Sequence, residues 1–208
     1  MVTRLYLGHD ARLPELAAPN QPIGQTHSGA LVGPGTGDNM ATSLGLDLQP
    51  GDVCISIGTS GVASTASVHD GTGFADATGV FRGLNTDTSR EDIARATVEG
   101  ILCSMRDAMV ALEDATKQET NRVLLIGGGA KSEAIRRIAP AIFGVDVLVP
   151  EPGEYVAMGA ARQAAWVLSG QALPPAWATQ GTPKHYEADP DTDTVARYEE
   201  LRDKTEGW

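Results

Sequence analysis

Short apolar runs recur along the chain, and their period predicts the element that each forms. Residues 52–57 (DVCISI) alternate between apolar and polar, a GTSG turn follows, and a run rich in Val, Ser and Thr covers 62–68. Two extended runs joined by a tight glycine turn are typical of a β-hairpin. We therefore predict a hairpin that turns at 58–61.

From Ser89 the period becomes helical. Ser89 and Asp92 have the spacing of a capping box, which favours the start of a helix at this point. The apolar residues that follow on one face are Val98, Leu102, Met105, Met109 and Leu112. The pattern predicts a helix of about seven turns that ends near Lys117.

Strand and helix patterns alternate after this helix. RVLLI (122–126) reads as a strand, 133–143 as a helix ended by Gly144, 145–150 as a strand and 155–169 as an alanine-rich helix. Pro140 is expected to shorten or kink the first of these helices. This order is typical of parallel strands with right-handed crossovers. Beyond Leu173 the chain becomes polar and proline-rich, and an exposed, charged helix is expected from Asp191, packed at the periphery.

Composition limits the possible functions. Apolar residues make up 41% of the 208 residues, which is ordinary for a chain with a buried core, and the net charge is −11 with few clustered cations. A nucleic-acid surface needs such clusters, so nucleic-acid binding is excluded. The chain has neither an apolar run long enough to span a membrane nor an apolar leader, and we expect a cytoplasmic protein without a membrane partner.

The two cysteines, Cys54 and Cys103, each lie in an apolar stretch and lack the close spacing of a metal site. We predict that both are buried free thiols and assign no metal ligand in this chain.

Two glycine clusters are candidates for binding phosphate or nucleotide. Gly58, Thr59 and Ser60 lie in the predicted hairpin turn, where backbone N–H groups and hydroxyls could face a phosphate; a plain turn is the simpler interpretation. GGGAKS (127–132) joins a strand to a helix, and its glycines would let a ligand approach the backbone. Tight packing explains that cluster equally well. Ser132 stands where a dinucleotide fingerprint needs its third glycine, which argues against a dehydrogenase.

A third glycine turn, GTGDN (35–39), carries an acidic residue. Asp38 follows the turn and begins a helix-compatible run, so it is either a helix N-cap or a carboxylate held on a rigid turn. A helix N-terminus favours the ionised carboxylate, which a general base requires.

Together these segments resemble the FGGY family of carbohydrate kinases. The matching pieces are GTGDN, PGDVCISIGTSGV, VEGILCSMRDAM and LLIGGGAKSEAIRRIAPAIFGVDVLVPEPGEYVAMGAARQAA, in the order that the family has them. Asn39 and the small residues after it are similar to the pentulose kinases, among them the xylulokinases. The resemblance implies an α/β, actin-like ATPase (ribonuclease H-like) C-terminal domain, with a mixed sheet flanked by helices.

The resemblance also implies a reaction, in which ATP and Mg²⁺ phosphorylate a ketopentose, D-xylulose giving D-xylulose 5-phosphate as in xylose catabolism. Asp38 would be the general base for the 5-hydroxyl, and Gly58, Thr59 and Ser60 would line the terminal phosphates of ATP. The residues implied to lie against the adenosine are Gly127, Gly128, Gly129, Ala130 and Ser132.

By the same resemblance, 1–47 would end a sugar-binding domain, 48–173 would form the nucleotide-binding domain and 174–208 a polar tail. Family members are more than twice as long, and a further segment is expected to be missing between Val68 and Asn85. We therefore expect the C-terminal part of a kinase, which binds nucleotide weakly, phosphorylates sugar poorly alone and forms a homodimer through exposed apolar surface. The alternatives are a kinase for ribulose, rhamnulose, gluconate or glycerol, and a non-catalytic actin-like module.

Overall fold

A computed structural model of the chain describes residues 8–66, 79–177 and 181–205. The end of the predicted hairpin near Val68 and most of the expected gap before Asn85 lie outside the described residues. In chain order, the elements are β1 (Gly24–Gln25), β2 (Leu31–Val32), α2 (Asp38–Gly45), β3 (Asp52–Ile57), β4 (Gly61–Thr65), α3 (Arg90–Thr116), β5 (Arg122–Ile126), η1 (Gly129–Lys131), α4 (Glu133–Phe143), β6 (Asp146–Val149), α5 (Tyr155–Ser169), β7 (Lys184–Tyr186) and α6 (Thr192–Thr205).

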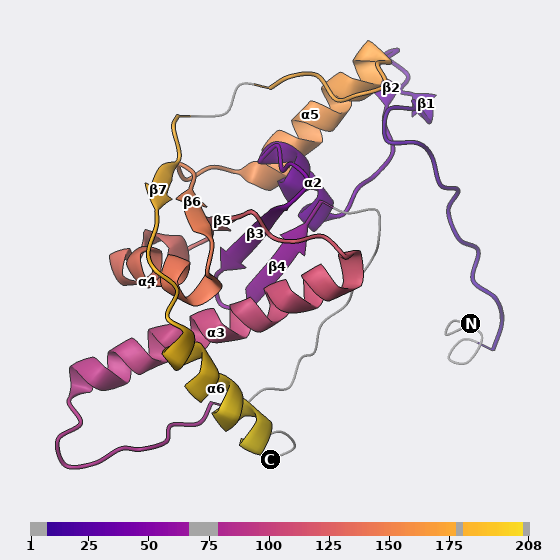
Figure 1. Ribbon diagram of the computed structural model, residues 1–208. Helices are drawn as coiled ribbons and strands as arrows, with labels where there is room; N and C mark the ends of the chain where they lie inside the picture. The colour runs from indigo at the N-terminus through magenta and orange to yellow at the C-terminus, as the bar shows by residue number, and fades with distance from the viewer. Residues whose placement is uncertain (1–7, 67–78, 178–180, 206–208) are drawn as a thin grey trace.

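A five-stranded mixed sheet forms the centre of the molecule, with the strand order β4-β3-β5-β6-β7 (Figure 1). The three inner strands are parallel, and the two outer strands run antiparallel to their neighbours. The predicted hairpin and the predicted parallel strands are therefore confirmed. The outer strand β7 was not predicted, because three residues in a polar segment give no periodic signal.

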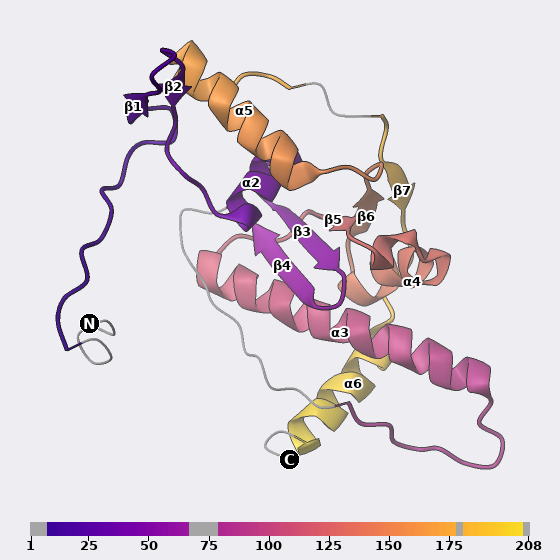
Figure 2. The ribbon, with the colours of Figure 1, turned by 180° about the vertical axis from the view of Figure 1, so that it is seen from behind.

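The sheet is buried on both faces, as the alternation of side chains along its strands requires. Val53 of β3 and Val123 of β5 point to the larger core, which α3, α4 and α6 cover. Cys54 and Leu124 point to the opposite face, where they pack with Leu46 and with residues near α2 and α5. Figures 1 and 2 show the resulting layers, with α2 and α5 on one side of the sheet and α3 on the other.

The longest helix begins and ends where its sequence predicts. Ser89 caps α3 in a capping box with Asp92, and the helix ends at Thr116 with Lys117 in the left-handed conformation (φ 56°). Leu102 and Met109, on the predicted apolar face, are buried against the sheet. The one-sided apolar pattern thus fixes how α3 lies on the sheet.

Pro140 does not shorten α4, which was one of the two effects that we expected. The helix continues to Phe143, and the Pro140 carbonyl accepts the N–H of Gly144, which ends the helix with a φ of 72°. Pro140 is fully buried. Its ring therefore contributes to the core, although proline cannot donate the backbone hydrogen bond to the carbonyl four residues earlier.

The C-terminal segment is more closely integrated than the predicted peripheral tail. β7 adds a strand to the sheet, and Val195 of α6 is buried in the larger core. Tyr198 and Arg202 of α6 both donate hydrogen bonds to Asp107 of α3, at 3.1 and 2.7 Å. None of the described helices has the length and apolar character needed to cross a membrane.

Candidate functional site

Two of the three predicted glycine turns lie side by side. β3 and β5 are adjacent parallel strands, and the 58–60 turn and the 127–129 loop leave their carboxyl ends. A methyl group placed on Gly127 would lie 2.6 Å from the carbonyl oxygen of Ile57, and one placed on Gly129 would lie 2.6 Å from Ile57 Cγ2. The last residue of β3 therefore rests on the glycine loop.

The three positions of that loop carry glycine for different physical reasons. Gly127 has a φ of 88° and a backbone contact that only glycine permits, and Gly129 has no room for a side chain. Gly128 has no other group within 4 Å of the position that a side chain would take. Packing thus accounts for Gly127 and Gly129, whereas Gly128 presents open backbone to the surroundings.

The residues that follow the glycines mainly shape the loop. Ala130 is buried in the larger core, and its carbonyl accepts a hydrogen bond from Nε of Arg136. Ser132 caps α4 by accepting the N–H of Ile135 at 3.5 Å. A 3-10 turn over Gly129–Lys131 precedes α4, which begins at Glu133, where the sequence predicts it.

The 58–60 turn is exposed and compact. Ile57 pairs with Gly61, and the N–H of Gly58 donates to the carbonyl of Ser60 at 2.9 Å, which closes a three-residue turn. Gly61 packs so closely on Met105 of α3 that an added methyl group would lie 2.5 Å from the sulfur. The hydroxyl-bearing side chains of Thr59 and Ser60 therefore stand on a turn that both strands and a long helix hold in place.

Asp38 is the first residue of α2, and the N-cap position belongs to Gly37. The N-cap interpretation of Asp38 is therefore wrong. The side chain is exposed, and its Oδ1 accepts the N–H of Asn39 at 2.8 Å. The Asp38 carbonyl accepts from the hydroxyl of Thr42 at 2.9 Å. These contacts are local to α2 and do not join Asp38 to either glycine turn.

The cysteines take no part in this arrangement. Both are free and buried, as predicted. Burial raises the pKa of the Cys54 thiol to about 12 and that of the Cys103 thiol to about 11. Neither thiol forms a nucleophilic thiolate near neutral pH.

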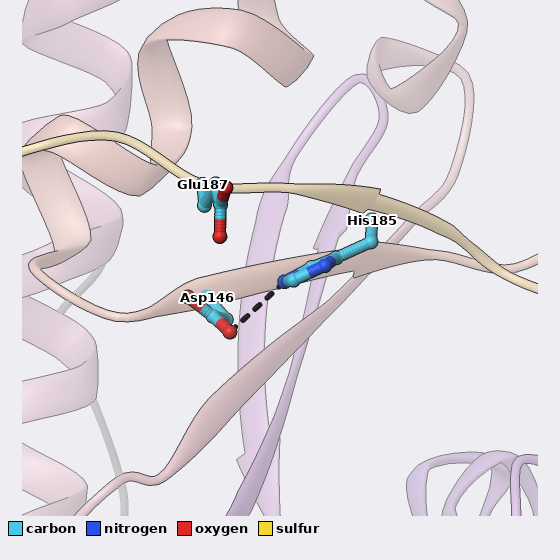
Figure 3. A group of neighbouring side chains, drawn as sticks. All are labelled: Asp146, His185 and Glu187. Carbon is cyan, nitrogen blue, oxygen red and sulfur yellow. Dashed lines mark hydrogen bonds and ion pairs between the residues drawn. The ribbon is translucent and has the colours of Figure 1, made fainter.

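One cluster of potential metal ligands escaped the sequence analysis. Asp146 of β6 lies beside His185 and Glu187 of the C-terminal segment, with one donor atom from each within 4.8 Å of the others (Figure 3). The ring nitrogen Nε2 of His185 lies 2.9 Å from Asp146 Oδ2, and all three residues are exposed. Only the unpredicted pairing of β7 with β6 brings them together.

This cluster is separate from the glycine turns. Asp146 pairs with Arg122, the first residue of β5, whereas the glycine loop follows the last residue of that strand. The cluster and the loop therefore lie at opposite ends of the parallel strands.

Comparison with known proteins identifies the family. The C-terminal domain of the FGGY family of carbohydrate kinases matches residues 74–168. A xylulose kinase from Streptomyces coelicolor is 30% identical over 77% of this chain and 48% of its own length. The crystal structure of a xylulose kinase from Bifidobacterium adolescentis superimposes with a TM-score of 0.79 and 34% identity, covering 91% of this chain and 53% of that one.

Other sugar kinases match shorter stretches. A gluconokinase from Bacillus subtilis is 33% identical over 41% of this chain and 17% of its own length, and glycerol kinases match to a similar extent. The chain is therefore also similar to kinases named for substrates other than xylulose.

The chain spans about half the length of the xylulose kinases that it matches. The alignment with the Streptomyces coelicolor protein extends over 230 residues, more than the 208 of this chain, so part of the relative has no counterpart here. This agrees with the internal deletion that the sequence predicts. The fold is that of the actin-like ATPases, and the chain belongs to the FGGY family of carbohydrate kinases, of which it represents the C-terminal part.

Proposed function

We propose that this chain is the nucleotide-binding part of a cytoplasmic sugar kinase that transfers the γ-phosphoryl group of ATP to D-xylulose. The observation that carries the proposal is the contact between the 58–60 turn and the 127–129 loop at the carboxyl ends of adjacent parallel strands. Crevices at the carboxyl ends of such strands are where open α/β sheets bind their ligands. We take a nucleotide and a sugar as the ligands because the chain belongs to a family of carbohydrate kinases.

In the proposed reaction, the two turns bind ATP and Asp38 acts on the sugar. The backbone N–H groups and hydroxyls of Gly58, Thr59 and Ser60 stabilise the terminal phosphates, and the open backbone at Gly128 lies against the adenosine. Asp38 accepts the proton of the 5-hydroxyl while the sugar oxygen bonds to the γ-phosphorus and the bond to the β-phosphate oxygen breaks. The products are D-xylulose 5-phosphate, ADP and a proton. Positioning and charge stabilisation supply most of the catalysis in such transfers.

Mg²⁺ enters this reaction as the partner of ATP. It prefers carboxylate and phosphate oxygens, whereas the two turns offer hydroxyls and backbone N–H groups. The two turns therefore do not form a magnesium site by themselves.

Isothermal titration of the chain with Mg-ADP tests the nucleotide site. Gly128→Leu should weaken binding at least tenfold, because the side chain would occupy the space proposed for the adenosine without disturbing the packing. Gly24→Leu is the matched control, since Gly24 also has open space around it and belongs to β1, outside the central sheet. Equal affinities for Gly128→Leu and the wild type would refute the adenosine assignment, and a folded wild type that binds no Mg-ADP would refute the nucleotide site.

The specific sugar and the oligomeric state belong to the same proposal. The matches to gluconate and glycerol kinases favour a second candidate function, in which another sugar takes the place of D-xylulose. A coupled assay with each sugar distinguishes the two candidates, and we expect slow turnover because the relatives are about twice as long.

We also propose a homodimer, which light scattering during gel filtration would distinguish from a monomer.

A further inference from the structure

Helix α2, which carries Asp38, rests on α5 with backbone against backbone. A methyl group on Gly45 would lie 2.1 Å from the carbonyl oxygen of Tyr155, and one on Gly159 would lie 1.7 Å from that of Ala41. Real side chains cannot approach so closely, so this crossing requires glycine on both helices. Figures 1 and 2 show α2 directly beside α5.

Arg162, nearly one turn beyond Gly159 on α5, holds the end of α2. Its side chain is 6% exposed, and its Nη1 donates to the carbonyl of Leu44 at 2.9 Å and to Asp47 Oδ1 at 2.7 Å. Its Nε donates to the carbonyl of Pro175 at 3.0 Å. Leu44 belongs to the last turn of α2, where the helix dipole favours a cation.

We call the contacts of Arg162 with Leu44 and Asp47 the clamp. They stabilise this arrangement because a buried guanidinium needs hydrogen-bond and charge partners. Without the Leu44 carbonyl and the Asp47 carboxylate, Arg162 would be an uncompensated charge in the interior. Asp47 has a left-handed φ of 55°, which turns the chain out of α2 toward the guanidinium. The charge on Arg162 therefore favours the arrangement in which the end of α2 is in place.

The opposite end of α2 also rests on α5, through the contact between Ala41 and Gly159, but the described hydrogen bonds of Asp38 are within its own helix. α2 has 8 residues, a length of about 12 Å. Rotation by about 10° at the clamped end would move Asp38 by roughly 2 Å at that length. A displacement of about 1 Å at a reacting group can cost on the order of 100-fold in rate.

We propose that Arg162 is a positioning residue for Asp38. By clamping the end of α2 to α5, it makes the aspartate and the two glycine turns parts of one rigid body. The proposal rests on the role proposed above for Asp38. It also means that the domain boundary expected after residue 47 is not a point at which the parts move against each other.

A pair of nitroxide labels measures the position of α2 directly. The exposed residues Met40 of α2 and Leu168 of α5 are replaced by cysteine and labelled, while the buried native thiols remain unlabelled. Electron paramagnetic resonance then gives the distribution of distances between the labels. Arg162→Met should at least double the width of this distribution in the folded protein, and Arg162→Lys should partly restore it.

Two further variants control the experiment. Arg137→Met removes an exposed arginine that pairs with Glu133 at 2.8 Å on α4, and it should leave the distribution unchanged. Asp47→Asn removes only the charge of the clamp partner and keeps a residue that tolerates the left-handed conformation. It should also widen the distribution, and it replaces Arg162→Met in the test if that variant does not fold. Mg-ADP affinity should stay within twofold of the wild type in every folded clamp variant.

The outcomes separate this proposal from the function on which it rests. The positioning role is overturned if folded Arg162→Met gives a distance distribution as narrow as that of the wild type. If Arg162→Met is unfolded, the same result for Asp47→Asn overturns it. A wider distribution together with more than a twofold loss of Mg-ADP affinity also overturns it, because the nucleotide side would have moved as well. A wild type that binds no Mg-ADP contradicts the proposed function alone, since the label distances still measure the clamp.

Discussion

The ion pair between Asp52 and Arg122 ties the first residues of β3 and β5 together. Nε of Arg122 donates to Oδ1 of Asp52 at 2.6 Å, and Nη2 donates to Oδ2 at 2.9 Å. The Asp52 carboxylate also accepts the N–H of Gln49 at 2.9 Å, where the chain enters β3 from α2. We expect Asp52→Asn to destabilise the protein by loss of this bidentate contact.

The magnitude follows from the burial of the two partners. Removing one partner of a fully buried pair costs about 3–5 kcal/mol, whereas an exposed pair contributes about 0–1 kcal/mol. The Asp52 side chain is 5% exposed but that of Arg122 is 41% exposed, so water can solvate the arginine that is left behind. The amide of asparagine still accepts the Gln49 N–H. We therefore expect a loss of about 1–3 kcal/mol for Asp52→Asn, and a larger loss for Arg122→Met, because the carboxylate that it leaves unpaired is buried.

Urea unfolding followed by circular dichroism measures both losses, and the double variant completes a mutant cycle. A coupling energy of about 1 kcal/mol or more would show that the pair acts directly. Each kcal/mol corresponds to about 2–4 °C in the melting temperature of a chain of this size. A loss below about 0.5 kcal/mol for Asp52→Asn would show that the contact does not persist in solution, and our reasoning from its burial would fail.

Three further predictions concern the glycine loop, the thiols and the candidate base. Gly127→Ala should destabilise the fold by about 1–3 kcal/mol in urea unfolding because of its φ and its contact with β3, whereas Gly128→Ala should change stability by less than about 1 kcal/mol; equal effects would contradict the packing described here. Because burial raises the pKa of Cys54 to about 12 and that of Cys103 to about 11, both should resist an aromatic disulfide reagent at pH 8 until the protein is unfolded. Rapid modification of the native protein would show that the core opens. Asp38→Ala should leave Mg-ADP affinity within twofold in calorimetry but lower any measured sugar phosphorylation by about 10²–10⁴-fold; unchanged phosphorylation would remove Asp38 as the base.

The sequence predicted the central elements because their signals are local. The alternation before the GTSG turn identified β3, and Ser89 with Asp92 identified the start of α3. The bounds of α5 also agree with the predicted helix at 155–169. In each case the apolar residues needed for burial recur at the period of the element, so that local pattern and tertiary packing agree.

The rest depends on contacts between distant residues. β7 is recognisable only through its pairing with β6, and the group around His185 depends on that pairing. Pro140 was expected to shorten or kink α4, yet the helix continues past it to Phe143 with the proline buried. Arg162 lies in an alanine-rich helix, and the neighbouring residues give no signal that predicts its contact with Leu44.

For the candidate site, the sequence located the two glycine turns but not the reason for each glycine. The close approach of Ile57 explains Gly127 and Gly129 without a ligand, and that contact joins residues about 70 positions apart. Gly128 remains the position at which the ligand prediction can be tested separately from packing. The assignments of Asp38 and of the phosphate-binding turn stay predictions.

The strand order of the sheet has a consequence for synthesis on the ribosome. β3 pairs with β5 only after the whole of α3 has been made, and the edge of β6 is covered only when β7 has emerged. A nascent chain that ends before residue 184 therefore presents an unpaired, apolar strand edge, which invites association between chains. Emergence of β7, rather than of the glycine loops, is therefore the step at which this edge of the sheet becomes paired.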